Sequence, residues 1–383
     1  MLSFTSFATT VRNTGRSCGR STFSRILLFA GFAFAFLLAT HPASAQRVII
    51  QQCPGCVDPG GGGVGGGGGL AYPTFNGGQQ YTNPTLYGSG QAISTDNYSP
   101  STVSCDNALW LAYTDANGNI QLYVSPDAVN FDGPLQTFQN SFYQTPAGTT
   151  LALGCLNNQL YFAYNLVGQI QYLIYDLPSG GVVAAGTYPN VSGMIGQPAL
   201  TTINGTLYLA YVINASGYNG LTYPQVFTSV WNGLSNPATG FYGNDVYYPV
   251  VSGTNPSLAS LNGSLAIVWL TGSGQNNPVV VVPPVGQTSA TAISQINETS
   301  GIMIGSSPAA VNFNNVLYIF GRSYYSEDNL WAIATSDGVN FANENEFGQS
   351  LRGIPSMTVF NGTLVEAERG NYNNDLWVYL ATY

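Results

Sequence analysis

Lysine is absent from this chain of 383 residues, histidine occurs once, and charged residues make up only 7% of the sequence. The single histidine is His41, and all eight basic residues are arginines. A chain so poor in imidazole has little scope for a Ser-His-Asp triad or for zinc bound by histidines. We therefore predict no catalytic triad, no metal site and no cofactor.

The first 45 residues have the pattern of an export signal. A basic segment precedes the apolar stretch 26–39, and Ala43-Ser44-Ala45 is a small-x-small cleavage site. The apolar stretch is short for a membrane span, so we expect cleavage and no transmembrane segment in the mature chain. This pattern predicts a secreted protein, extracellular or periplasmic. The basic residues are Arg12, Arg16, Arg20 and Arg25.

Removal of this segment leaves no histidine and four arginines against seventeen acids, a balance of 4 − 17 = −13. Such a surface repels phosphate backbones and anionic membranes, which argues against nucleic acid as a partner. The surface must instead be built from neutral amide and hydroxyl side chains. We therefore expect a monomer whose partners are neutral glycans or components of a cell envelope or extracellular matrix.

A glycine run at 60–69 cannot bury a core and is typical of a flexible linker. We assign 46–69 to a Cys- and Gly-rich linker and 70–383 to a single folded domain. Export permits disulfides among the cysteines that remain after cleavage. Two of them lie in neighbouring repeats but one position out of phase, so their pairing stays open. The four cysteines are Cys53, Cys56, Cys105 and Cys155.

One short pattern recurs six times: an apolar residue, a turn through Asn-Gly, Asn-Asn or Asp-Asn, and an alternating apolar run. Asn tolerates the positive φ of two-residue turns, so each copy predicts a β-hairpin. The shared leucine recurs at intervals of 51, 47, 58, 52 and 47 residues, which indicates a β-propeller. The leucines are Leu109, Leu160, Leu207, Leu265, Leu317 and Leu364.

Each repeat divides into four short strands. In the fifth repeat we predict them at 308–313, 317–321, 330–335 and around Phe341. Four antiparallel strands make one blade, so the expected fold class is all-β, a six-bladed β-propeller. The long interval before Leu265 leaves five or seven blades open.

The last repeat is one strand short, with strands predicted at 355–360, 364–369 and 376–383. The segment Leu70–Phe75 precedes the first complete repeat and has no partner there. We predict that this N-terminal strand completes the last blade and closes the ring, because closure removes an edge that would invite aggregation.

Two turns between outer strands carry a shared motif, Ser336-Asp337-Gly338-Val339-Asn340-Phe341 and Ser125-Pro126-Asp127-Ala128-Val129-Asn130-Phe131. Both resemble the Asp-box of sialidase-like propellers, Ser-x-Asp-x-Gly-x-x-Trp/Phe, at a shortened spacing. The resemblance implies a structural turn, in which the carboxylate accepts backbone N–H bonds and the aromatic ring packs between sheets. It covers the repeat region as architecture and implies a fold, not an activity.

Glycosidases on this fold project carboxylates into the central funnel, mainly from the innermost strands, and usually need two of them. None of the six innermost strands predicted here contains an acid. The arginines of the sialidase-like family come from separate blades, whereas Arg322, Arg352 and Arg369 all lie in the last two repeats. We therefore predict a non-catalytic module. The alternative is a sialidase-like or other glycoside hydrolase with an acid supplied by a loop, such as Asp106 or Asp328.

The last two repeats also match locally, each with an arginine, a tyrosine and an acid. Guanidinium and carboxylate can bind pairs of sugar hydroxyls while an aromatic ring packs on the C–H face, so we predict a lectin-like site. The alternatives are a surface ion pair without function and a structural surface protein without a small ligand. The candidate ligand-binding residues are Arg322, Tyr324, Tyr325, Asp328, Arg369, Tyr372, Glu366 and Glu368.

Glu366 and Glu368 occupy positions that are apolar or aromatic in the other repeats, for example Leu209 and Tyr211. Two unpaired acids in a core would destabilise it strongly, so we expect these two to face water or Arg369. A ligand or Ca²⁺ site is the alternative.

Overall fold

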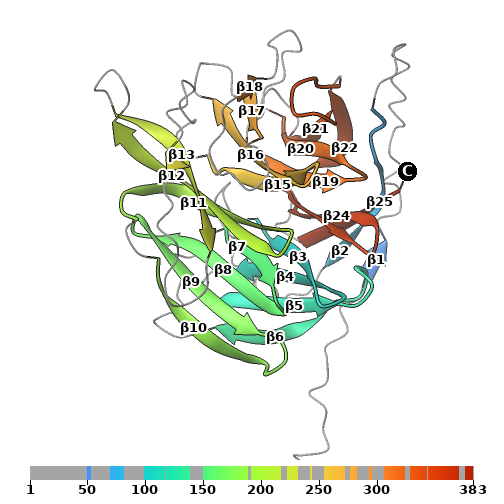
Figure 1. Cartoon of the computed structure of the whole chain (residues 1–383). Coiled ribbons are helices and arrows are strands. Elements are labelled where there is room, and N and C mark those ends of the chain that lie inside the picture. The colour runs from blue at the N-terminus through green and yellow to red at the C-terminus, as the bar shows by residue number, and fades with distance from the viewer. Residues whose placement is uncertain are drawn as a thin grey trace, which may run out of the picture. The chain divides into compact units, whose positions relative to one another are not determined.

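Short antiparallel strands are arranged around a central axis (Figure 1). The computed structural model describes residues 50–52, 70–81, 99–115, 117–138, 150–188, 191–216, 222–231, 242–243, 254–271, 277–282, 293–295, 306–323, 328–342, 344–370 and 376–382. Within these ranges the secondary structure consists of strands and turns, and no helical segment could cross a bilayer.

Five sheets each contain four antiparallel strands in chain order, and each sheet is one blade. Blade 1 contains β3 (Ser101–Cys105), β4 (Ala108–Thr114), β5 (Ile120–Ser125) and β6 (Asp132–Phe138). Blade 2 contains β7 (Ala152–Leu156), β8 (Gln159–Leu166), β9 (Gln169–Asp176) and β10 (Gly181–Thr187). Blade 3 contains β11 (Met194–Ile203), β12 (Thr206–Ser216), β13 (Thr222–Trp231) and β14 (Tyr242–Gly243).

The remaining sheets follow the same order until the last one, which takes strands from both ends of the domain. Blade 4 contains β15 (Ser257–Leu261), β16 (Ser264–Thr271), β17 (Asn277–Val281) and β18 (Ile293–Gln295). Blade 5 contains β19 (Ala309–Phe313), β20 (Val316–Arg322), β21 (Asn329–Thr335) and β22 (Asn345–Ser350). Blade 6 contains β23 (Ser356–Phe360), β24 (Thr363–Arg369), β25 (Leu376–Thr382), β2 (Thr74–Tyr81) and β1 (Ile50–Gln52).

The innermost strands form a closed ring. Contacts run from β3 to β7, β11, β15, β19 and β23, and β23 returns to β3. The fold is therefore a six-bladed β-propeller, as predicted, and the alternatives of five or seven blades are excluded.

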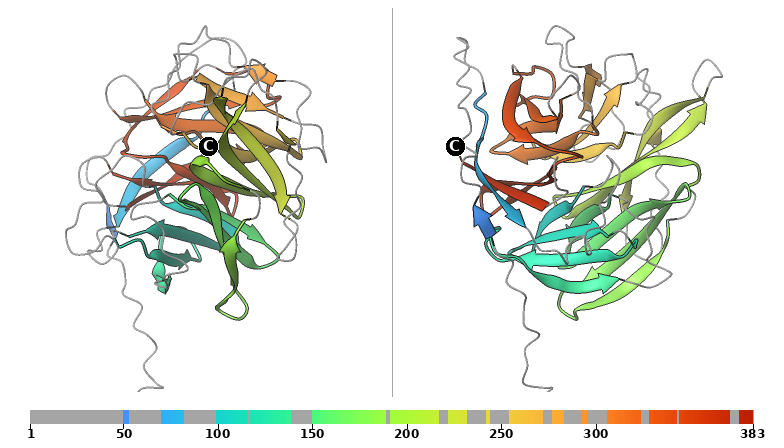
Figure 2. Two further views of the ribbon diagram at one scale, coloured as in Figure 1. Left: turned by 90° about the vertical axis from the view of Figure 1, so that its left-hand side faces the viewer. Right: turned by 180° about the vertical axis from the view of Figure 1, so that it is seen from behind.

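The N-terminal strand closes the ring, although it begins later than predicted. The strand β2 pairs with β25 from Thr74↔Thr382 to Tyr81↔Leu376. Figure 2 shows this blue strand beside the red strands of the last blade. The side chain of Phe75 sets the register: it is buried, and its ring lies 5.3 Å from that of Phe347 between centroids. The strand β1, inside the segment assigned to the linker, pairs with the outer side of β2.

The six hairpin turns between the first and second strands of each blade have the predicted geometry. Both central residues of every turn have positive φ, between 49° and 76°. This is the conformation of a two-residue turn whose twist matches that of the flanking strands. The Asn-Gly, Asn-Asn and Asp-Asn pairs therefore recur in every repeat because these residues adopt the positive φ that the turn requires.

The two acidic turns between outer strands are built alike, with one correction to the predicted motif. In blade 1 the Ser125 hydroxyl donates a hydrogen bond to the Asp127 carboxylate at 3.0 Å. In blade 5 the hydroxyl that donates to the Asp337 carboxylate belongs to Thr335, at 3.1 Å, and not to Ser336 as the motif predicted. Ser336 is exposed, whereas Thr335 is buried. The shortened spacing concealed this register. Bonds from the Asn340 backbone, its side chain and the Val339 backbone lower the pKa of Asp337 to about 2.

The fourth strand of blade 5 was predicted around Phe341, and this prediction is wrong. The fourth strand is β22, which begins at Asn345. Phe341 makes only an isolated bridge to Thr335, because the turn at Asp337 uses the residues between them to reverse the chain. Its half-buried ring packs against the cluster between blades 4 and 5, while Phe131 at the matching position of blade 1 is buried.

Hydrophobic side chains fill every interface between neighbouring blades. Six clusters of buried residues lie at these interfaces, one at each, so each blade is covered on both faces. Each blade therefore depends on both of its neighbours to cover its hydrophobic faces.

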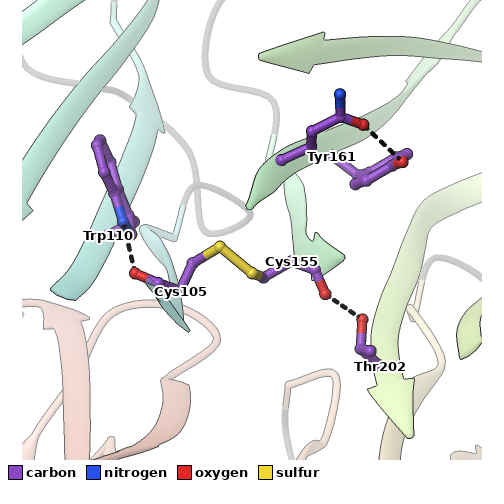
Figure 3. The surroundings of a disulfide bond; sticks show 6 residues. Cys105, Trp110, Cys155, Tyr161 and Thr202 are labelled. Atoms are coloured by element: carbon purple, nitrogen blue, oxygen red, sulfur yellow. Dashed lines mark hydrogen bonds between the residues drawn. A yellow bond between two sulfur atoms is a disulfide. The ribbon is translucent and has the colours of Figure 1, made fainter. Parts of the chain in front are cut away.

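A disulfide joins the innermost strands of blades 1 and 2 and settles the pairing left open above. Cys105 and Cys155 are bonded across a Cα–Cα distance of 5.7 Å. Figure 3 shows the extension of this link: Trp110 Nε1 donates to the Cys105 carbonyl, and the Thr202 hydroxyl of blade 3 donates to the Cys155 carbonyl. Blades 1, 2 and 3 are thus connected near the hairpin ends of their innermost strands. Cys53 and Cys56 lie outside the described residues.

Replacing Phe75 by alanine tests the closing strand. We expect Phe75→Ala to lower the free energy of unfolding by about 3–5 kcal/mol, because the substitution leaves a cavity against Phe320 and Phe347. Urea unfolding followed by tryptophan fluorescence measures the change. The control is Val183→Ala on the outer strand β10, where the side chain is 46% exposed and we expect less than about 0.5 kcal/mol. Equal losses in both variants would contradict the assigned register.

A glycine pair separates backbone strain from crowding at the acidic turn. Gly338 and Gly362 have φ of 77° and 75°, but an added Cβ would lie 2.9 Å from Val282 Cγ2 at Gly338 and near nothing at Gly362. We expect Gly362→Ala to destabilise by about 1 kcal/mol from strain alone, and Gly338→Ala by about 1–3 kcal/mol more. Thermal unfolding of both variants gives the difference, and a smaller loss in Gly338→Ala would refute this packing.

Candidate functional site

A central channel runs between the six innermost strands, with one cavity at each end. The cavity of about 140 Å³ lies where these strands begin, and we call its opening the proline mouth. The cavity of about 390 Å³ lies nearer the hairpin ends of the same strands. The described residues that line both are neutral: hydroxyl, amide and apolar side chains, with no acid or arginine. The prolines of the mouth are Pro100, Pro198, Pro256, Pro308 and Pro355.

A chain of hydrogen bonds surrounds the proline mouth. At four of the junctions between blades, the backbone N–H of the residue before the proline donates to the side chain at the corresponding position of the next blade. This arrangement pairs N–H groups that the β-ladders leave free. The bonds are Ile354 N to Ser99 Oγ (2.6 Å), Ser99 N to Thr150 Oγ1 (3.2 Å), Gln197 N to Asn255 Oδ1 (2.7 Å) and Asn255 N to Ser307 Oγ (2.7 Å).

A second tier of bonds lies deeper in the channel. Thr102 N donates to Ser356 Oγ at 2.9 Å, and Ala310 N donates to Ser257 Oγ at 2.8 Å. These hydroxyls accept hydrogen bonds from neighbouring blades, so their role in the channel wall is to connect the blades. Neither tier is predicted from the sequence above, although a polar residue before the proline of several repeats was the available signal.

Among the described residues, an ion pair lies at the edge of blade 5, outside the lining of the channel. Arg322, the last residue of β20, and Asp328, just before β21, form an ion pair with Nη1 to Oδ1 at 3.2 Å. Their side chains are 19% and 39% exposed, so both can be reached from solvent. Among the residues described, no other pair of opposite charges lies within bonding distance. Tyr324 and Tyr325, predicted to complete this cluster, lie outside the described residues.

The backbone holds both charges of this pair in position. Arg322 N donates to Ser306 Oγ at 3.0 Å, and the Asp328 carbonyl accepts from Leu351 N at 2.8 Å. Asp328 itself has a φ of 54°, which turns the chain into β21. The pair is therefore fixed at the rim between blades 5 and 6.

Arg369 does not repeat this arrangement, although the two segments match in sequence. Its side chain is buried, with 1% exposure, at the end of β24. Along β24 it alternates with Val365 and Ala367, which belong to the cluster between blades 6 and 1. Tyr372, its predicted neighbour, lies outside the described residues. Burial places Arg369 out of reach of a ligand in solution.

Glu366 and Glu368 also differ from the expectation that they face water or Arg369. Their exposures are 0% and 1%, and strand alternation places them on the opposite face of β24 from Arg369, toward blade 5. Burial, together with the neighbouring Glu368, raises the pKa of Glu366 well above its usual value. Burial also raises the pKa of Glu368, to about 8. Among the members of the predicted ligand-binding set that the structure describes, Arg322 and Asp328 are accessible, whereas Glu366, Glu368 and Arg369 are buried.

The described residues contain no group of three or more His, Cys, Asp or Glu side chains placed to hold a metal ion. The two acidic turns use their carboxylates for bonds within the turn: Asp127 and Asp337 each accept from two backbone N–H groups and one asparagine side chain. These acids stabilise turns and are not aimed into the channel.

No protein-family model and no curated sequence matches this chain. The solved structures that share its fold include the three described next. An α-L-arabinanase from Penicillium chrysogenum complexed with arabinobiose is 17% identical, with 74% of this chain and 92% of that chain covered and a TM-score of 0.50. A mutant of the Aleuria aurantia lectin, in complex with Fucα1-6GlcNAc, is 13% identical, with 74% and 94% covered and a TM-score of 0.51.

The SapL1 lectin in complex with α-methyl fucoside is 9% identical, with 76% of this chain and 95% of that chain covered and a TM-score of 0.54. At such identities the likeness extends to the fold and no further. This likeness supports the β-propeller fold that the sequence motifs predicted. The resemblance of the acidic turns to those of sialidase-like propellers stays a prediction. The chain is thus a six-bladed β-propeller whose neighbours in structure include lectins and an arabinanase.

Proposed function

We propose that this domain is an exported, non-catalytic module that binds neutral saccharides at the rim of blades 5 and 6. The observation that carries the proposal is the accessible Arg322–Asp328 pair, fixed by the backbone at this rim. Export follows from the N-terminal signal pattern and is part of the proposal.

The chemistry of the pair suits sugar hydroxyls. A guanidinium presents several N–H donors in a planar fork, and a carboxylate accepts from hydroxyl groups, so adjacent hydroxyls can bind to both at once. The two charges offset one another, which leaves the rim without a strong preference for charged ligands. The acidic balance of the mature chain disfavours anionic sugars in addition.

The comparisons support the class of ligand by analogy. The ligands named with the three similar structures are arabinobiose, Fucα1-6GlcNAc and α-methyl fucoside, all uncharged sugars. Because identity is low, the analogy concerns what this fold can accommodate and names no sugar for this chain.

The lack of acids in the described channel lining supports binding without catalysis. Glycosidic cleavage usually needs two carboxyl groups about 5–9.5 Å apart beside the scissile bond. Glu366 and Glu368 cannot serve, because both are buried within blade 6. Useful affinity would come from multivalent glycans, since one rim site with few contacts binds weakly.

A glycan array tests the binding proposal. We expect the mature protein to bind a subset of neutral glycans, and Arg322→Ala to lower affinity for the strongest of these by about 10–100-fold, because one charged hydrogen-bonding group is lost. Titration calorimetry with that glycan gives the ratio. Asp328→Asn should weaken binding less, because the amide keeps one acceptor oxygen.

The matched control is Asp132→Asn, which removes an exposed acid on β6 of blade 1 and should leave affinity unchanged. Absence of binding to every neutral glycan would favour a structural surface protein. Binding that is indifferent to Arg322→Ala would place the site elsewhere. Thermal unfolding of all three variants confirms that their folds are intact.

A hydrolysis screen tests the second half of the proposal. Incubation of the mature protein with aryl arabinosides, fucosides and sialosides should release no more chromophore than buffer alone. Turnover that is abolished by a single substitution, for example Asp106→Asn or Asp328→Asn, would identify a loop acid at the funnel. In that case the protein is a glycoside hydrolase and the non-catalytic assignment is wrong.

A further inference from the structure

Two carboxyl groups are enclosed in the blade that closes the ring. Glu366 and Glu368 lie two residues apart on one face of β24, opposite Tyr379 and Trp377 of β25 in register. Their exposures are 0% and 1%, and none of their four carboxyl oxygens has a hydrogen-bond partner within normal geometry among the described residues. A buried polar group of this kind requires a physical account.

The same positions in other blades contain core residues. Counted from the shared leucine, the position of Glu366 is apolar in all five other blades, and that of Glu368 is aromatic in four of them. All these side chains are buried. The two acids therefore replace residues that pack one blade on the next. The equivalents of Glu366 are Leu111, Phe162, Leu209, Ile267 and Ile319, and those of Glu368 are Tyr113, Tyr164, Tyr211 and Trp269.

The strands around the pair provide few charges. The strands β19 and β23 contain no titratable residue, and β25 contributes Tyr379. Across the interface, Tyr318 and Arg322 lie on the face of β20 that packs on blade 6, and Arg322 is bound to Asp328. The strand β22 and the residue before it contribute Glu346, which bonds Asn329, and Glu344. Arg369 lies on the other face of β24.

Ionising the pair in place would put two like charges in an apolar interface. An unpaired buried charge destabilises a fold strongly, and a second charge on the same strand face adds repulsion. Protonated carboxyls avoid both penalties, and each can donate a hydrogen bond to the other or to Tyr379. The folded ring therefore favours protonation of the pair.

We propose that Glu366 and Glu368 form a proton-dependent lock between blades 5 and 6, which holds the ring closed while both carboxyls are protonated and loosens the closing blade when they ionise. The lock is independent of any sugar site. It acts where the two ends of the domain meet, since β24 is paired with β25 and β25 with the N-terminal strand β2. Acidic surroundings tighten the ring, and alkaline surroundings weaken it at this interface.

The pKa shifts set the direction and the pH window. Burial raises the pKa of both groups in the folded ring, that of Glu368 to about 8, whereas an unfolded glutamate titrates at about 4.3. Protons are therefore lost from the unfolded chain first. The stabilisation is complete below about pH 4 and declines as pH rises toward about 8. Ordinary acid denaturation runs the opposite way, through groups such as Asp337, whose pKa is lowered.

The test compares the full mature chain with Glu366→Gln/Glu368→Gln, which cannot ionise. Between pH 5 and pH 8 we expect the unfolding equilibrium constant of the wild type to rise by at least about 100-fold, and that of the double variant by less than about 10-fold. The control is Glu346→Gln, an exposed acid of blade 5 whose removal should keep the wild-type slope. It accounts for general repulsion in an acidic protein. An equal slope in the wild type and the double variant would overturn the proposal.

Two further measurements keep the test decisive if the double variant does not fold. Infrared spectroscopy of the wild type at pH 6 should show the carbonyl band of buried protonated carboxyl groups, and its absence refutes the lock. Hydrogen exchange at pH 8.5 should be faster than at pH 6, after correction for intrinsic rates, in β23–β25 and not in β7–β9. Uniform behaviour of the two blades would also refute it.

Discussion

Pairing of β2 with β25 is the constraint on which the rest of the ring depends. Each blade buries hydrophobic side chains on both faces, so an open array would expose one face at each end. The strand Thr74–Tyr81 adds the outer strand of blade 6, and Phe75 inserts into the cluster shared with blade 5. Closure of the core thus rests on segments about 300 residues apart in sequence, the kind of long-range pairing that forms only against a large entropy of loop closure.

Links between neighbouring blades reinforce this closure from within. The disulfide Cys105–Cys155 and the bonds around the proline mouth connect innermost strands, and they engage the hydroxyl and amide groups of the channel. The described residues that line this channel are uncharged. The Arg322–Asp328 ion pair lies outside this lining, at the ends of strands of blade 5.

Blades 5 and 6 concentrate the unusual residues of the protein. The accessible ion pair, the buried Arg369 and the buried carboxyl pair all lie within the last two repeats, beside the point where the ring closes. Four of the five earlier blades have an apolar or aromatic side chain at both positions where blade 6 has glutamate. The last blade thus combines closure of the fold with the buried carboxyl pair, and under the proposed lock the stability of the ring depends on the protonation of that pair.

The repeat, its hairpin turns and the missing strand of the last blade were readable from sequence, because backbone propensity and period are local properties: Asn-Gly pairs and the recurring leucine were sufficient. The hydroxyl partner of Asp337 was assigned one residue too late because the spacing of the motif is shortened. The pairing of Cys105 with Cys155 could not be predicted, because it depends on how neighbouring blades align. Arg322 and Arg369 lie in segments with matching sequences, and only the tertiary structure shows that Arg322 is accessible and Arg369 is buried. It also shows that Glu366 and Glu368 are buried. Burial is decided by which face of a blade meets its neighbour, and a single strand does not contain that information.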